Sequence, residues 1–248
     1  MISRFGDGAR LHVFDALLST QNAARGFIEA HGTNAVRHAF YTENQTGGRG
    51  RVGKSWYAPP GANVSLSVIV PPVPDAHRWR LTFAVGVAVV LALRRFVPEG
   101  FVHLRFPNDV LIRGKKVAGI LVEIADLGLP IVGIGVNVCG DTGAMPPDVA
   151  VRATTIEQET NTVTSLADVR EAILTSLAVV WEIWFHDNDF AAVLALWHDF
   201  HDPDARRTFT IRGEPVSCRV LGVTETGTVT LELPDGSHDT LPVAHILL

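Results

Sequence analysis

The hydrophobic and polar positions in the first two thirds of the chain alternate between helical and strand-like spacing. Near the N-terminus, LSTQNAARGFIEAHG predicts a helix that begins at Ser19 or Thr20, whose hydroxyl can accept a hydrogen bond from a free first-turn N–H, and that ends at Gly32. The run LTFAVGVAVVLAL, residues 81–93, is shorter than the ~20 apolar residues that span a bilayer, and we expect a buried core helix. Two more helices are predicted in TSLADVREAILTSLAVVWEIWF, which starts with the capping pattern Ser165 to Asp168, and over roughly residues 190–200.

Five further runs have strand character: AVRHAFYTE, NVSLSVIV, FVHLRF, KVAGILVEI and IVGIGVNV. In NVSLSVIV larger residues alternate with smaller ones, which predicts a half-buried strand. The hydrophobicity of the last three runs, FVHLRF, KVAGILVEI and IVGIGVNV, predicts central strands of one sheet. The connection from Ile112 to Lys116 is too short for a crossover helix, so this sheet is expected to be at least partly antiparallel.

From Asp202 on, the pattern changes to short alternating strands, TFTI, VSCRVLGV, TVTLEL and DTLPV. The pairs Arg212-Gly213, Thr226-Gly227 and Asp235-Gly236 are typical of the turns between them. The sequence therefore predicts two domains, residues 1–201 and a small β-barrel over residues 202–248. Such a short domain is near the lower size limit for independent folding, so we expect it to lean on the larger one.

Composition and charge narrow the class of protein. The formal net charge of −5 and the pI near 6.0 leave no positive field for duplex binding, so nucleic acid is not an expected partner. Cys139 and Cys218 have no C-x-x-C companion, and the ten histidines form no ligand cluster, so we predict no protein-held metal. The first 20 residues lack the apolar block of a secretory signal. A cytoplasmic protein without a membrane segment is expected.

The glycine-rich stretch TENQTGGRGRVGKSW, residues 42–56, fits two phosphate-binding patterns at once, G-x-G-x-x-G and G-x-x-x-x-G-K-S. Both a Walker loop and a Rossmann turn need a helix directly after the loop, but here WYAPP and a strand follow. A kinase glycine loop does lie between strands, yet no H-R-D or D-F-G occurs. What remains is a loop carrying Arg49, Arg51 and Lys54, which suits a multiply charged anion. A solvated basic loop is the alternative.

Three blocks, in this order along the chain, resemble the biotin protein ligases: GRGRVGKSWYAPPGANVSLS, RFPNDVLIRGKKVAGILVE and IVGIGVNV. The similarity extends over roughly residues 12–248. It implies an α+β fold, with a mixed, largely antiparallel sheet flanked by helices as in class II synthetase-like catalytic domains, and a C-terminal SH3-like β-barrel. The few residues before the resemblance leave no room for an N-terminal helix-turn-helix, so the monofunctional type is expected.

The resemblance implies a two-step reaction. Biotin and ATP, with Mg²⁺ carried by the nucleotide, form biotinyl-5′-AMP and pyrophosphate, and the biotinyl group then passes to a lysine of the biotin carboxyl carrier domain of a biotin-dependent carboxylase. Because two anions meet in the first step, fixed positive charge is the main requirement, and Arg49, Arg51 and Lys116 are the candidates. The resemblance places Lys116 near both the biotin carboxylate and the α-phosphate. Asp109 is a candidate for deprotonating the incoming amine or holding magnesium, or else a turn residue.

The resemblance also implies a largely apolar pocket with a few directed polar groups. The family's Ser-Thr-Asn is Ser-Thr-Gln here, so Gln21 or Asn22 must serve. Trp56 packs either on the adenylate or in the core, and Asn137 either touches the nucleotide or satisfies backbone groups. The expected biotin-binding residues are Ser19, Thr20, Gln21, Gln45, Gly48, Arg49, Lys116 and Gly119, and the expected nucleotide-binding residues are Arg49, Arg51, Trp56, Asn108, Lys116 and Asn137.

Two alternatives to a biotin ligase remain. A lipoate or octanoate ligase has a related fold, but its signature, an Arg-Arg-x-x-Gly-Gly-Gly loop followed by a His-Asp pair, does not occur in this sequence. A non-catalytic nucleotide-binding module leaves Lys116 without a role. The sequence leaves monomer and homodimer open. Residues 46–56 are expected to be mobile without ligand and ordered over the adenylate.

Overall fold

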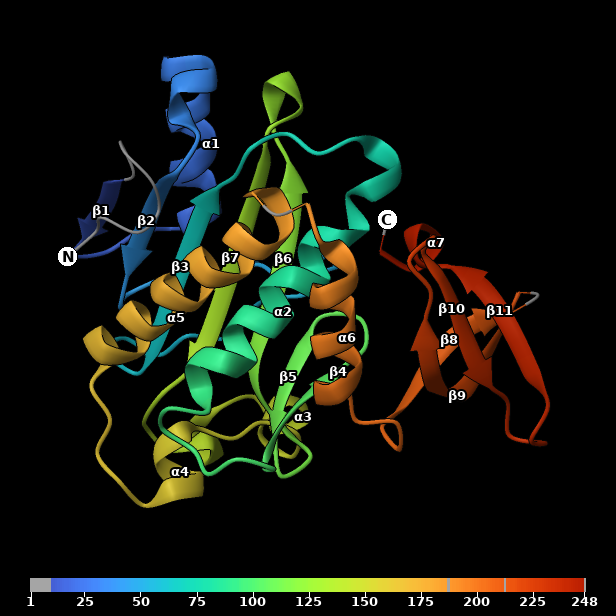
Figure 1. Cartoon of the computed structure of the whole chain (residues 1–248). Coiled ribbons are helices and arrows are strands. Elements are labelled where there is room, and N and C mark those ends of the chain that lie inside the picture. The colour runs from blue at the N-terminus through green and yellow to red at the C-terminus, as the bar shows by residue number, and fades with distance from the viewer. Residues whose placement is uncertain (1–9, 187, 212, 248) are drawn as a thin grey trace.

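The computed structural model describes residues 10–186, 188–211 and 213–247. Its larger part is a seven-stranded sheet in the order β1-β2-β3-β7-β6-β5-β4 (Figure 1). Strands β1 and β2 are parallel, and the other neighbours in this sheet are antiparallel, which confirms the mixed, largely antiparallel sheet. The strands are β1 (Arg10–Phe14), β2 (His38–Thr42), β3 (Asn63–Ile69), β4 (Val102–Arg105), β5 (Asp109–Ile112), β6 (Lys115–Ile124) and β7 (Pro130–Asn137).

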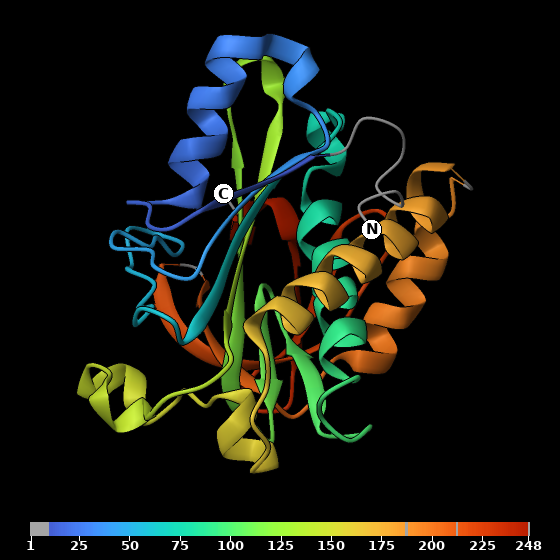
Figure 2. The same ribbon diagram turned by 90° about the vertical axis from the view of Figure 1, so that its left-hand side faces the viewer.

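Helices cover both faces of this sheet. Figure 2 shows α1 (Thr20–His31) on one side and α2 (Trp79–Leu93), α5 (Leu166–Trp181) and α6 (Phe190–Phe200) on the other. The predicted start of α5 is confirmed, because the Ser165 side chain accepts a hydrogen bond from the N–H of Asp168. The shorter helices are α3 (Pro147–Ala150), α4 (Ile156–Thr160) and α7 (Val243–Leu247).

Helix α2 is the core of the larger part, as its composition predicted. Its apolar side chains pack between the sheet and helices α5 and α6, and most of them are fully buried. The stretch Asp75–Leu93 is long and apolar enough to cross a membrane by length and composition, but 72% of its apolar 18-residue window is buried inside the protein. A buried position between two layers accounts for that hydrophobicity.

The prediction of a half-buried strand over NVSLSVIV was wrong. All seven residues of β3 are buried. Val64, Leu66 and Val68 belong to the core cluster around α2, whereas the opposite face of the strand lies under α1, where Ser67 contacts Thr20. The alternation of large and small residues therefore reflects two buried faces: the larger side chains pack in the main core, and the smaller ones lie under α1. It does not indicate one buried face and one solvated face.

Two strands were missed by the sequence pattern. Strand β1 has a half-exposed pattern and pairs only with β2 among the described strands. Strand β5 was read as part of a connection, because it is four residues long and is bounded by turn-forming residues on both sides. It is instead the middle strand of the β4–β5–β6 meander, and it begins at Asp109. Asp109 is therefore a strand residue and not a turn residue.

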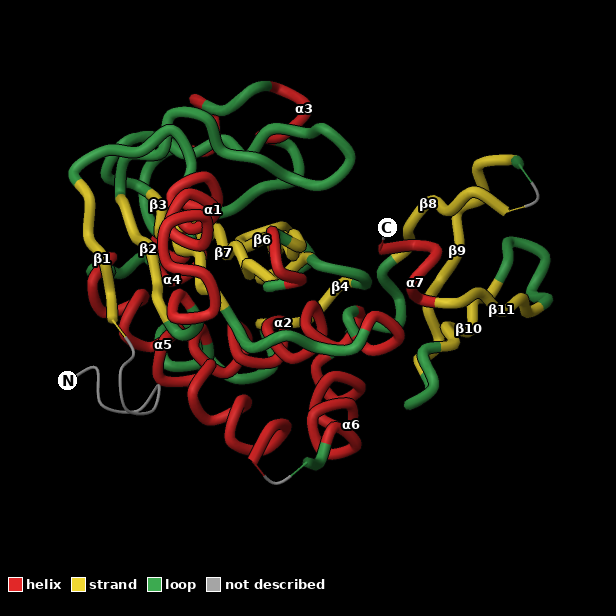
Figure 3. Tube along the Cα trace, turned by 90° about the horizontal axis from the view of Figure 1, so that it is seen from above, coloured by secondary structure: helices red, strands yellow, loops and turns green. Residues whose placement is uncertain are grey.

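The C-terminal region forms a second, four-stranded antiparallel sheet in the order β11-β10-β9-β8, which fits the expected SH3-like unit. Figure 3 shows it at one side of the molecule, next to β4. The turns at Thr226-Gly227 and Asp235-Gly236 are confirmed, with positive φ at both glycines, while Arg212 lies outside the described residues. The strands are β8 (Arg206–Ile211), β9 (Glu214–Val223), β10 (Thr228–Glu232) and β11 (His238–Pro242).

This second sheet leans on the larger part, as its size predicted. The two share one continuous hydrophobic cluster, in which the rings of Phe106 and Phe209 have centroids 6.0 Å apart. The buried imidazole of His201 lies between the carbonyl oxygens of Leu104, at 3.2 Å, and Val220, at 3.0 Å. The division of the chain after residue 201 stays a prediction.

Candidate active site

A cavity of about 930 Å³ lies between the start of α1, the glycine-rich loop, strands β5 to β7, the segment around α3, and β8. It joins segments that are far apart in the sequence. Every predicted site residue except Gly48 lines it, namely Ser19, Thr20, Gln21, Gln45, Arg49, Arg51, Trp56, Asn108, Asp109, Lys116, Gly119 and Asn137.

The glycine-rich loop folds as a small hairpin, and no helix follows it before β3. The N–H of Trp56 donates to the carbonyl oxygen of Gly48 at 2.9 Å, and the N–H of Gly50 donates to that of Lys54 at 2.6 Å. A Cβ on Gly48 would lie 2.6 Å from the carbonyl oxygen of Trp56, so the hairpin closes only because position 48 is glycine. Gly48 thus shapes the loop without lining the cavity.

The cavity has a glycine floor on β6 and β7. Gly119 and Gly135 are paired across the two strands, and the ring of Trp56 lies over both. A Cβ on Gly135 would overlap this ring, and one on Gly119 would lie 3.2 Å from the Nζ atom of Lys116. The Nζ atom is 5.4 Å from the centroid of the Trp56 ring. Trp56 is therefore a cavity residue in contact with Lys116, and not part of the core.

Asp109 is the centre of a cluster of cations at one end of the cavity. Its Oδ1 atom lies 2.6 Å from Lys116 Nζ, while Oδ2 lies 2.9 Å from a guanidinium nitrogen of Arg105 and 2.6 Å from one of Arg207. Its side chain is 4% exposed. Burial alone would raise the pKa of Asp109, but Lys116, Arg207 and Arg105 outweigh it and hold the pKa well below its usual range. The carboxylate is therefore a stable anion and a weak proton acceptor.

The arginines of the hairpin point to different ends of the cavity. Arg51 donates to the carbonyl oxygen of Ile246 in α7. Burial lowers the pKa of Arg51, and the neighbouring Arg207 lowers it further, against the opposite effect of Asp109. Arg51 thus adds a fourth guanidinium or ammonium group to the cluster around Asp109.

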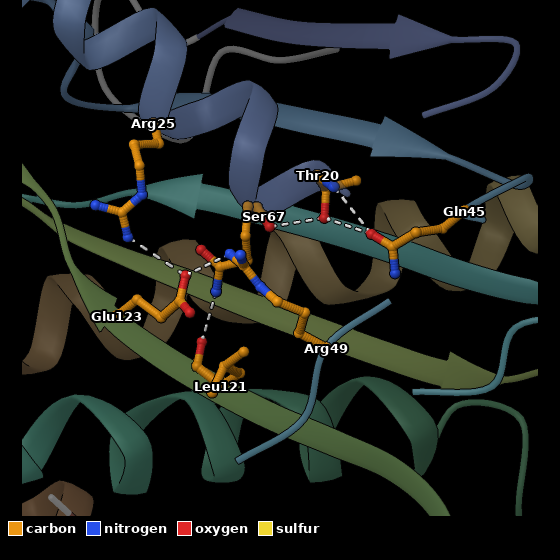
Figure 4. Close-up of polar contacts among 8 residues, drawn as sticks. Thr20, Arg25, Gln45, Arg49, Ser67, Leu121 and Glu123 are labelled. Carbon is orange, nitrogen blue, oxygen red and sulfur yellow. Dashed lines mark hydrogen bonds and ion pairs between the residues drawn. The ribbon is translucent and has the colours of Figure 1, made fainter. Parts of the chain in front are cut away.

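Arg49 lies at the other side, in an ion pair. One of its nitrogens is 2.9 Å from Glu123 Oε2, and Arg25 of α1 reaches the same oxygen at 3.5 Å (Figure 4). The side chain of Arg49 is 41% exposed, so it can be reached from the cavity. The hairpin is held to β6 by this contact.

Uncharged groups surround the first turn of α1. Ser19 is the N-cap, but its hydroxyl makes no capping hydrogen bond, so that part of the prediction was wrong. Gln45 Oε1 accepts instead from the N–H of Thr20 at 2.9 Å and from its hydroxyl at 3.2 Å (Figure 4). The same hydroxyl is 2.7 Å from that of Ser67 on β3. The turn is thereby fixed against both the loop and the sheet.

Gln21, and not Asn22, faces the cavity. Its Nε2 atom donates to the carbonyl oxygen of Leu121 at 3.0 Å, which fixes the orientation of the amide. Its Oε1 atom is buried and has no hydrogen-bond partner in the described protein. Asn22 is exposed on the outer side of α1. An unpaired buried acceptor is costly unless a ligand supplies the donor.

The two predicted asparagines differ in whether their side chains keep an acceptor without a hydrogen-bond partner. The amide nitrogen of Asn108 donates to the carbonyl oxygen of Ile120 at 2.8 Å, and its Oδ1 atom is buried without a partner. Asn137 donates to the carbonyl oxygen of Thr154 at 3.0 Å and accepts from Asn63 at 2.8 Å. Asn137 therefore satisfies neighbouring groups, whereas Asn108 keeps an acceptor available.

Sequence reasoning missed two segments that complete the cavity. The segment around α3 pairs with the start of β6, because the N–H of Lys116 donates to the carbonyl oxygen of Arg152 at 2.7 Å. Nothing in its weakly patterned sequence marks it as a wall of the site. The missed lining residues include Met145, Val149 and Arg152 from this segment, and Arg206, Arg207 and Thr208 from β8.

The cavity fits an elongated ligand with a hydrogen-bonding head at one end and negative charge at the other. Unpartnered polar atoms of Gln21, Trp56 and Asn108 are available to it, and the glycine floor leaves room for a flat group. The cations around Asp109 suit phosphate groups. No group of three or more His, Cys, Asp or Glu side chains that could hold a metal ion occurs within residues 10–186, 188–211 and 213–247.

Comparison with known proteins shows which sequences and folds this chain resembles. Residues 15–137 match the sequence model of the biotin/lipoate A/B protein ligase family. The chain is 29% identical over 240 residues to the bifunctional ligase/repressor BirA of Bacillus subtilis (strain 168), covering 92% of this chain and 71% of that one. It is also 29% identical over 213 residues to the biotin–[acetyl-CoA-carboxylase] ligase of Paracoccus denitrificans, covering 82% and 86%.

The fold has a solved counterpart. The biotin protein ligase of Aquifex aeolicus, in complex with biotin and ATP, superposes with a TM-score of 0.78 at 22% identity, covering 94% of this chain and 95% of that one. Residues 15–137 of this chain therefore form a domain of the biotin/lipoate A/B protein ligase family.

Proposed function

We propose that the chain is an ATP-dependent biotin–protein ligase. It joins biotin to ATP, giving biotinyl-5′-AMP and pyrophosphate, and then transfers the biotinyl group to a lysine of a carrier domain. The observation that carries the proposal is the position of Lys116, which lies between the ring of Trp56 and the buried carboxylate of Asp109 at the wall of one cavity. The named activity of the Paracoccus relative supports the same reaction.

In the first step, an oxygen of the biotin carboxylate attacks the α-phosphorus of ATP, and the bond to the bridging oxygen breaks to release pyrophosphate. Magnesium bound by the nucleotide would supply positive charge to the leaving phosphates. Lys116 neutralises the charge where the two anions meet, and Arg49 and Arg51 come from the hairpin that closes over them. Preorganised charge of this kind stabilises the transition state without further rearrangement.

In the second step, the amine nitrogen of the carrier lysine attacks the acyl carbon, and AMP leaves. Asp109 is a poor base for this amine while three cations face it, because its pKa is held low. The same contacts leave it no free oxygen for magnesium. We therefore assign Asp109 to holding Lys116 in place, and the proton of the amine to the departing phosphate or to water.

We assign a different part of the ligand to each end of the cavity. The ureido head of biotin is assigned to the α1 end, where Gln21 Oε1 can accept from one of its N–H groups, together with Ser19, Thr20 and Gln45. The nucleotide is assigned to the side of Trp56, Asn108 and Asn137. Gly119 contributes backbone that lets the ligand approach closely, while Gly48 allows the hairpin beside it to close.

The carrier substrate is proposed to be the biotin carboxyl carrier domain of a biotin-dependent carboxylase, in line with the name of the Paracoccus relative. A reducing, cytoplasmic location is proposed with it, since Cys139 and Cys218 are both free thiols. The monofunctional type, the absence of nucleic-acid binding and the choice between monomer and homodimer stay predictions.

ATP–pyrophosphate exchange tests the function directly. The purified protein is given ATP and Mg²⁺ with biotin, with lipoate, or with neither acid. We expect exchange with biotin alone, followed by mass-detected biotinylation of an added carrier domain. Exchange with lipoate only would favour a lipoate ligase, and nucleotide binding without exchange would indicate a non-catalytic module.

A further inference from the structure

We propose that Arg207, in the first strand of the C-terminal sheet, is a positioning residue for Lys116 and acts through Asp109. The inference rests on the proposed function, because it concerns the rate of the adenylate-forming step. It makes the C-terminal sheet a working part of the active site and not only an appended unit.

The contacts form a relay of three groups. Arg207 reaches Oδ2 of Asp109 at 2.6 Å, and Lys116 Nζ reaches Oδ1 of the same carboxylate at 2.6 Å. Since the two oxygens belong to one rigid plane, fixing Oδ2 also fixes Oδ1. Arg105 approaches Oδ2 as well, at 2.9 Å, so this oxygen is held from two directions. The direction of the carboxylate then sets where the ammonium group of Lys116 lies.

Burial makes this relay stiff. The side chain of Asp109 is 4% exposed, so little water is available to replace a lost partner. Side chains of Lys116 and Arg207 are 30% and 31% exposed, and both line the cavity. A lysine on a flexible stem would sample many positions without an anion held in one orientation. The rigid anion gives Lys116 its single position.

Arg207 is itself fixed by the docking of the C-terminal sheet. It pairs with the buried Cys218 in the β8–β9 ladder. Phe209, two residues along and so on the same face of β8, packs against Phe106. Phe106 lies between Arg105 and Asp109 in the sequence, so the docking contact and the ion pair belong to one short stretch. A shift of the C-terminal sheet would therefore change the position of the Lys116 ammonium group.

The test measures adenylate formation by ATP–pyrophosphate exchange in the full-length protein. For Arg207→Ala we expect kcat to fall about 10- to 100-fold, with the KM for biotin changed by less than about 3-fold, because misplacement of a reacting group costs rate more than binding. Arg207→Lys keeps a cation near Oδ2 and should recover most of the loss. The control is Arg219→Ala on β9 of the same sheet, because Arg219 and its two carboxylate partners, Asp204 and Glu232, do not line the cavity.

A double-mutant cycle with Asp109→Asn decides whether the effect passes through the carboxylate. If Arg207 acts through Asp109, then Arg207→Ala should change the exchange rate by less than about 2-fold in the Asp109→Asn background. An equal loss in both backgrounds, or a rise of the ATP KM in both, would mean direct contact with the nucleotide and would overturn the relay. The relay would also be overturned if Arg207→Ala alone left the exchange rate unchanged, or if Arg207→Lys were as slow as Arg207→Ala.

Two controls keep the outcomes apart. Thermal unfolding of each variant, compared with Arg219→Ala, shows whether the C-terminal sheet is still docked; a folded Arg207→Lys protein keeps the test open if Arg207→Ala unfolds. Wild-type protein without biotin-dependent exchange would refute the proposed function before any variant is compared. Active wild type with an unaffected Arg207→Ala would refute this inference alone.

Discussion

The two ends of the cavity hold their polar groups by different means. At the start of α1, uncharged side chains bond to one another and to backbone, and Gln21 keeps one buried acceptor unpaired. At the start of β5, a single buried anion is surrounded by Lys116, Arg105 and Arg207. Neutral hydrogen bonds are short-ranged and directional, whereas charges act over a longer range.

We propose that this difference separates two tasks. The α1 end can distinguish one uncharged head group from another, because a missing donor leaves Gln21 unsatisfied. The β5 end stabilises negative charge with little regard for what carries it. We therefore expect changes at the α1 end to appear in the KM for biotin, and changes at the β5 end to appear in kcat.

The largest expected effect is at the charged end. Lys116→Ala should slow adenylate formation about 10²- to 10³-fold, the usual cost of removing one preorganised donor to a developing charge. The measurement is single-turnover formation of biotinyl-5′-AMP. Lys115→Ala is the matched control, because Lys115 precedes it on β6 but is exposed and outside the cavity. Near-normal rates in Lys116→Ala would remove the catalytic role from this end.

A pH experiment tests the charge cluster without any ligand. The pKa of Asp109 is depressed in the folded protein by its three cations, against the effect of burial. Its contribution to stability is thus complete above the unfolded pKa of about 4 and is lost as the pH falls from there toward the folded pKa. We expect the difference in unfolding free energy between wild type and Asp109→Asn, on the order of 2 kcal/mol at pH 7, to shrink toward zero in acid.

Urea unfolding at pH 7 and at several values below pH 4 measures this difference. Because other carboxylates also lose stability in acid, the quantity compared is the gap between the two proteins and not either curve alone. A gap that stays constant with pH would show that Asp109 does not owe its place to the surrounding cations.

At the uncharged end, Gln21→Leu should raise the KM for biotin about 10-fold with a smaller change in kcat. The substitution removes both the acceptor at the cavity and the donor to Leu121, at nearly constant volume. Asn22→Ala, on the exposed side of the same turn, is the control. A loss confined to kcat would contradict the division of tasks between the two ends.

The local sequence pattern correctly predicted the elements whose bounds are set by interactions within a few residues. The helix over residues 190–200 has the predicted bounds, and the start of α5 has the predicted cap, because periodicity and capping act within a few residues. The glycine loop was placed between strands for the same reason: no helix can begin at WYAPP. Strand β5 escaped notice, since four residues between turn signals have no periodicity to detect.

The features that the sequence did not predict depend on which faces of helices and strands pack against each other. The two buried faces of β3 follow from its packing against α1 and α5, which are far apart in the sequence, so no short window of sequence contains both partners. Arg207 lies 98 residues from Asp109, and its role depends on the docking of a second sheet. The motifs singled out Lys116 and its partner Asp109, which both line the cavity, but only long-range packing brings Arg207 to that carboxylate.

The smallest expected effect separates fixed hydrogen bonds from helix flexibility at the α1 end. Gly26 lies on the exposed side of α1 with nothing within 4 Å of an added Cβ, so Gly26→Ala should stabilise the protein by about 0.5–1 kcal/mol through the helix preference of alanine. Thermal unfolding measures this gain. Because Thr20 and Gln21 are held by Gln45, Ser67 and Leu121, the KM for biotin should not change. A KM that moved with the stability of α1 would mean that the helix, and not its hydrogen bonds, sets the affinity at this end.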